Sequence, residues 1–122
     1  LLDAQRLNRI LDNEKRLSGE ESTFTLAEMM SQLNRIVFNE AASNQEQRAL
    51  QRILVDHFLK LSQSEDNTLP AEAKQLAALQ LMRIKKTSQS FHNKAKDDYT
   101  IAHYESIQRR IIKELEQSSD KF

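Results

Sequence analysis

The chain of 122 residues contains no cysteine, and it has only one glycine, Gly19, and one proline, Pro70. The absence of cysteine excludes thiol nucleophiles, disulfide bonds and thiolate metal ligands. With so little glycine and proline, the chain lacks the residues that form tight hairpins and glycine-rich phosphate loops. Long helices are therefore the expected secondary structure.

Neither sign of charge dominates, because 18 Lys and Arg residues balance 18 Asp and Glu residues. Non-specific nucleic-acid binding depends on an excess of clustered cations, so this balance argues against a nucleic-acid partner. No apolar run approaches the ~20 residues that a membrane-spanning helix needs. With 39% hydrophobic and 30% charged residues, we expect a folded, water-soluble chain.

The length fits one domain with one hydrophobic core, so we expect residues 1–122 to form a single helical domain. The first residue is Leu1 rather than Met, and no basic region followed by an apolar stretch opens the chain. We therefore expect the chain to be a fragment of a larger protein.

Apolar residues recur at spacings of three and four along most of the chain, which is the pattern of amphipathic helices. The residues expected on these apolar stripes include Ile36, Tyr99 and Ile112. Together they predict an all-α fold, a bundle or array of about five amphipathic helices. The expected helices cover residues of about 3–17, 25–40, 44–63, 71–92 and 99–115.

Three local signals predict where helices begin. Thr25 followed by Glu28, and Ser43 followed by Glu46, have the spacing of a capping box, in which each side chain bonds a free backbone N–H. Pro70 suits the first turn of the fourth helix, where a missing N–H removes no intrahelical hydrogen bond.

The sequence predicts no catalytic, cofactor-binding or metal-binding residue. Its three histidines, His57, His92 and His103, never lie four residues apart as in the helical HExxH zinc motif. A metal site assembled in space from histidines and carboxylates stays an alternative. No GxSxG or SxxK pattern supports a serine nucleophile. Paired acids such as Asp97 and Asp98 are interpreted as helix-start residues rather than as a general acid and base.

One local basic surface is also predicted. It could receive a phosphate or an acidic partner, although we favour its interpretation as a solvated helix face. Its residues are Arg83, Lys85, Lys86, Lys94 and Lys96.

Three stretches resemble the C-terminal helical region of large bacterial zinc-dependent metalloproteases of the metzincin kind. The first is Val37-Phe38-Asn39-Glu40, and the second is Arg48-Ala49-Leu50-Gln51-Arg52, which is similar to an RxLQR signature. The third runs from Asp98 through Thr100, Ala102 and His103 to Arg110, Ile111 and Leu115. Leu54 stands where that family often has an aromatic residue.

The resemblance implies a parent protease whose preceding catalytic domain holds zinc through an extended HExxHxxGxxH motif and hydrolyses peptide bonds. This chain contains none of that motif, so it is expected to be inactive alone and to have its own upstream catalytic domain as partner. The parent would be secreted or held at the bacterial cell envelope. Arg48, Gln51, Arg52 and His103 are hypothesised to make structural polar contacts that lock helices together or hold the domain on the catalytic domain.

Two other functions stay open on the sequence. The chain could be a stand-alone helical module that binds a partner helix or peptide. It could also be an enzyme with an unfamiliar helical site, which would need converging carboxylates and histidines.

Overall fold

The computed structural model describes residues 2–14, 23–65 and 71–119, and side chains within 2–12, 26–65 and 71–115. Over these residues the secondary structure is entirely helical, with no strand. The predicted all-α fold class is confirmed. The helices are α1 (Ala4–Glu14), α2 (Thr23–Val37), α3 (Gln45–Ser62), α4 (Ala71–Lys94) and α5 (Asp98–Ser119).

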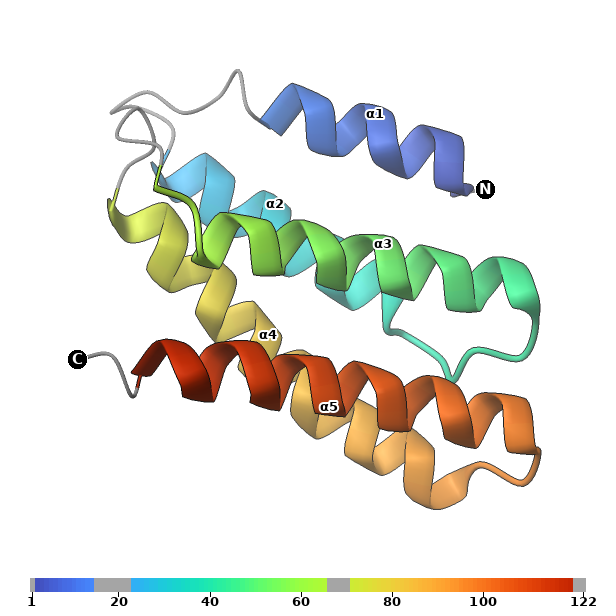
Figure 1. The fold of residues 1–122 in the computed structure, drawn as a ribbon. Coiled ribbons are helices and arrows are strands. Elements are labelled where there is room, and N and C mark those ends of the chain that lie inside the picture. The colour runs from blue at the N-terminus through green and yellow to red at the C-terminus, as the bar shows by residue number, and fades with distance from the viewer. Residues whose placement is uncertain (1, 15–22, 66–70, 120–122) are drawn as a thin grey trace.

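The five helices form a two-layered array in which successive helices run in opposite directions (Figure 1). In this view α1, α3 and α5 lie side by side in front, and α2 and α4 lie behind them. The most extensive interhelical contacts are those of α4 with α3 and with α5, followed by α4 with α2. Helix α4 therefore makes the most extensive contacts of the described helices, whereas α3 contacts all four of the others.

One hydrophobic cluster holds the array together, and each described helix contributes to it. Its largest fully buried side chains include Tyr104, Phe58 and Leu7. On α4 the buried face carries Ala73 and Ala77, whose small side chains let neighbouring helices approach closely. Burial of these stripes, rather than intrinsic helix propensity, supplies most of the stability of such helices.

Three residues of the predicted apolar stripes are exposed among the described side chains, and they are Ile36, Tyr99 and Ile112. Ile36 is 60% exposed, because the buried stripe of α2 runs through Leu33 and Val37, and Ile36 lies about 100° from Val37 around the helix. Tyr99 is 77% exposed, because the first turn of α5 turns Thr100 inward instead. Ile112 is 37% exposed, because the buried face of α5 runs through its neighbour Ile111.

The helix starts differ slightly from the predicted ones. Asn44, not Ser43, is the N-cap of α3, and its side chain accepts a hydrogen bond from the backbone N–H of Gln47 at 2.9 Å. The backbone N–H and the hydroxyl of Ser43 both donate to Gln47 Oε1, at 2.8 and 2.9 Å. The predicted capping box of Ser43 and Glu46 is therefore wrong in its residues. Asn44 caps the helix, and the Gln47 side chain reaches back to Ser43, the residue before the cap, rather than to the backbone N–H of the cap itself.

Helix α2 begins at Thr23, two residues before the predicted cap Thr25, and the side chain of Thr25 is not among the described ones. Gly19 and Pro70 lie outside the described residues.

Candidate functional site

Three segments distant in the sequence meet at the side chain of Gln51, in the middle of α3. Gln51 Nε2 donates to the backbone carbonyl oxygens of Val37 at 3.2 Å and of Glu40 at 3.3 Å, where α2 ends and the next loop begins. Gln51 Oε1 lies 2.9 Å from Nε2 of His103 on α5. Gln51 is only 1% exposed, so these hydrogen bonds form away from water, where an unsatisfied amide would be costly.

These contacts determine which nitrogen of His103 carries the proton. Because the two carbonyls can only accept, the Gln51 amide must present its nitrogen to them and its oxygen to His103. The Nε2 atom of His103 therefore donates, and Nδ1 is left as an acceptor with no hydrogen-bond partner in the described part of the chain. Burial, with the nearby charges of Arg52 and Arg48, lowers the pKa of His103 from 6.5 to about 4. The imidazole is neutral at pH 7 and is a weak base.

The loop between α2 and α3 is held by α5 as well. Tyr104 is fully buried, and its hydroxyl oxygen accepts the backbone N–H of Ala42 at 2.7 Å. The hydroxyl of Thr100 lies 3.3 Å from the carbonyl oxygen of Ala42 and 2.9 Å from Asp97 Oδ2. Asp97 also accepts the backbone N–H of Thr100 at 2.9 Å and so caps α5. Burial raises the pKa of Tyr104.

We call Gln51, Thr100, His103 and Tyr104, together with the backbone of residues 37–42, the polar network. It joins the end of α2, the following loop, α3 and α5. Each member bonds a fixed partner in the protein. Such a network favours one arrangement of the helices, because any other would leave buried polar groups unsatisfied.

A shallow surface cleft of ≈ 460 Å³ lies next to the polar network and is lined by Gln45, Arg48, Arg52 and Tyr99. We call these four residues the Arg–Tyr surface. The Arg48 guanidinium lies 5.9 Å from the centre of the exposed Tyr99 ring, within the range of a cation–π contact. Arg52 is exposed and makes no hydrogen bond or ion pair with the described residues.

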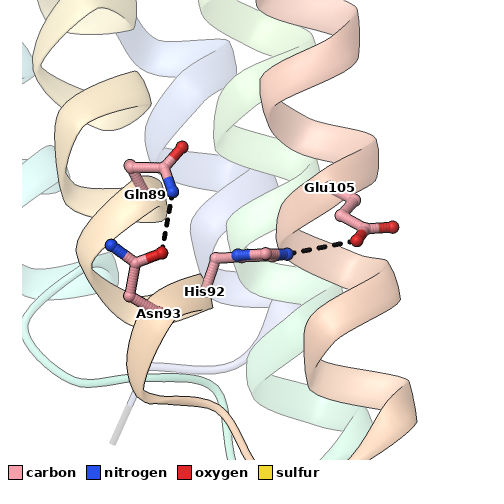
Figure 2. Close-up of polar contacts among 4 residues, drawn as sticks. All are labelled: Gln89, His92, Asn93 and Glu105. Atoms are coloured by element: carbon pink, nitrogen blue, oxygen red, sulfur yellow. Dashed lines mark hydrogen bonds and ion pairs between the residues drawn. The ribbon is translucent and has the colours of Figure 1, made fainter.

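Among the described side chains, two ion-pair contacts join α5 to its neighbours. Arg110 on α5 pairs with Asp56 on α3. On the other side, Nε2 of His92 on α4 lies 3.1 Å from Glu105 Oε1 (Figure 2). Both contacts are partly open to solvent and therefore contribute little to stability.

The four residues predicted to make structural polar contacts, Arg48, Gln51, Arg52 and His103, have different surroundings in the structure. The fold brings Gln51 and His103 into hydrogen-bond contact, whereas Arg48 and Arg52 influence His103 through their charges and line the surface beside it. Sequence reasoning missed a second buried pair, Asn34 on α2 and Gln80 on α4, whose side chains meet at 2.8 Å. The available signal was the position of each amide within an apolar stripe.

In the described ranges, no group of three or more His, Asp or Glu side chains is placed to hold a metal ion. The same residues contain no helix that is both long enough and apolar enough to span a bilayer.

Comparisons of the chain with protein-family models, with curated proteins and with solved structures find no match.

Proposed function

We propose that this chain is a non-catalytic, C-terminal helical accessory domain of a bacterial zinc-dependent metalloprotease. In this proposal the parent protein hydrolyses peptide bonds with zinc held in its upstream catalytic domain, and it acts outside the cell or at the cell envelope. The helical domain supplies no zinc ligand and no catalytic group. Its role is to complete the fold of the parent and to support one wall of the catalytic cleft.

The convergence of three segments at Gln51 is the observation that carries this proposal. Each of the three stretches that resemble the metalloprotease region supplies an atom to one set of hydrogen bonds, through Val37 and Glu40, through Gln51, and through His103. The resemblance was based on order and spacing alone. Joining α2, α3 and α5 through these hydrogen bonds is a reason for the three stretches to occur together in a domain of this kind.

The Arg–Tyr surface is the face by which we expect the domain to contact its upstream catalytic domain. Tyrosine and arginine are the side chains that most often dominate the binding energy of protein interfaces. Arg48 and Arg52 line this surface from α3, and the exposed Tyr99 ring lies 5.9 Å from the Arg48 guanidinium. The expected partner is therefore an acidic surface with room for a tyrosine ring.

The first experiment is to determine the coding sequence upstream of Leu1 and to look for the extended HExxH motif. If the motif is present, the full-length protease should then be compared with its R52A and Y99A variants. We expect the isolated helical domain to melt normally in both variants, and peptide hydrolysis by the full-length protein to fall. Unchanged activity in both variants would remove the docking role.

A matched control is R109Q in the full-length protein, because Arg109 is an exposed arginine of α5 outside the Arg–Tyr surface. It should leave hydrolysis unchanged. An upstream sequence without a zinc motif would reject the protease assignment. The Arg–Tyr surface would then favour the alternative, a helical module that binds other proteins.

A further inference from the structure

Helix α4 has an unbalanced charge that the totals for the whole chain hide. Between Glu72 and Asp97 the sequence has no acidic residue, although it has six basic ones. The six are Lys74, Arg83, Lys85, Lys86, Lys94 and Lys96. Positive charge is therefore concentrated along α4, which carries five of the six, and just after its end, where Lys96 lies, in a chain whose net charge is zero.

Part of this charge faces a groove between α4 and α2. The groove has a volume of ≈ 550 Å³, and three cationic side chains line it, Arg83 and Lys86 from α4 and Arg35 from α2. No lining residue is acidic. The remaining polar lining residues carry hydroxyl or amide groups and are Ser31, Asn34, Asn39, Gln80 and Thr87.

Within the described residues, none of the three cations is neutralised by the protein. Arg35, Arg83 and Lys86 make no ion pair there. Nor does any of them have an Asp or Glu three or four residues away, the spacing at which helical ion pairs form. Their mutual repulsion would be relieved by an anion bound between them.

The floor of the groove adds fixed hydrogen-bonding groups. Asn34 Nδ2 donates to Gln80 Oε1 at 2.8 Å, and both side chains are at least nine-tenths buried. This hydrogen bond orients the Gln80 amide, so the two side chains form a fixed polar part of the groove.

We propose that the α2–α4 groove binds the phosphate group of a soluble phosphorylated small molecule. Two guanidinium groups match the geometry of phosphate oxygens, and the lysine adds a third positive charge. The volume is in the range of small-molecule sites, so the groove can hold more than the phosphate itself. This proposal stands on the charge and shape of the groove and is independent of the proposed protease function.

Calorimetric titration at low ionic strength, with inorganic phosphate and pyrophosphate as probes, tests the proposal. We expect wild-type protein to bind pyrophosphate more tightly than phosphate, and R83Q/K86Q to weaken pyrophosphate binding by roughly tenfold or more. The matched control is K74Q/K85Q, which removes two charges from the same helix. Lys74 and Lys85 lie about 180° and 200° from Arg83 around α4, away from the groove, so binding should change less than about twofold.

Three outcomes would overturn the proposal. The first is that neither probe binds the wild type. The second is an equal loss of affinity in both double variants, which indicates a general charge effect. The third is binding to phosphatidylglycerol vesicles without binding to pyrophosphate, which indicates a membrane surface. Circular dichroism of each variant checks that it is folded. If R83Q/K86Q unfolds, R35Q removes one charge from the opposite wall and should weaken pyrophosphate binding by itself.

Discussion

Gln51 and His103, 52 residues apart in the sequence, meet in a buried hydrogen bond of 2.9 Å between α3 and α5. The same Gln51 side chain holds two backbone carbonyls of the preceding loop region. One amide thus fixes the position of three segments. Because both partners are buried, the bond couples helix packing to the protonation of His103.

The stability of the domain should decrease as the pH falls from about 6.5 to about 4. Burial lowers the pKa of His103 to about 4 in the folded protein, whereas in the unfolded chain it is near 6.5. Between these values the unfolded state binds a proton that the folded state excludes, so acidification favours unfolding. The full effect is on the order of 3 kcal/mol, at about 1.4 kcal/mol per pKa unit. Urea unfolding at several pH values measures it, and H103Q should show a shallower dependence.

Replacing Gln51 with Ala should destabilise the domain by about 2–4 kcal/mol. The change leaves two buried carbonyls and the His103 N–H without partners and opens a cavity. The control is Q89A, since Gln89 is an exposed glutamine of α4 whose side chain bonds Asn93 one turn away (Figure 2). Its unfolding free energy should change by less than about 0.5 kcal/mol. Equal effects of the two substitutions would contradict the role given to the polar network.

Tyr104→Phe isolates the hydroxyl that accepts the Ala42 N–H. The ring stays in place, so the expected loss of about 1–3 kcal/mol reflects an unsatisfied buried donor rather than lost packing. Thermal unfolding of Y104F beside Y99F provides the comparison. Because Tyr99 is exposed, Y99F should melt within a degree or so of wild type.

Glu105→Gln should change the unfolding free energy by no more than about 0.5 kcal/mol at neutral pH. The contact between His92 and Glu105 is partly exposed, and water screens such pairs. Denaturant unfolding at low and high salt should therefore give nearly the same difference between E105Q and wild type. A loss of several kcal/mol would show that this contact, rather than the polar network, holds α5 in place.

The sequence was sufficient for the number of helices and for most of the core. Spacings of three and four identified Leu54, Phe58 and Leu81 as buried, and they are. The sequence was insufficient to predict how much of each helix surface is buried, because periodicity alone does not tell how many helices pack around it. Val55 and Leu59 are buried beside the predicted stripe of α3, since α3 packs against α1, α2, α4 and α5 at once.

Polar partners were harder to predict than apolar faces. The pairing of Asn34 with Gln80, 46 residues away, depends on how α2 crosses α4, and a linear sequence does not contain that crossing. The groove has the same origin, because Arg35 joins Arg83 only in the folded protein. The predicted basic surface included Lys85, which does not line the groove, and lacked Arg35, which does.

The Ala42 amide, finally, is a built-in reporter of motion in α5. It belongs to a loop rather than to a helix, yet its N–H is bonded to the Tyr104 hydroxyl and the residue is 2% exposed. Its hydrogen can exchange with deuterium only when this bond opens, so its exchange rate follows the separation of the loop from α5. A single resonance of a short loop thus measures how often the loop and the last helix come apart.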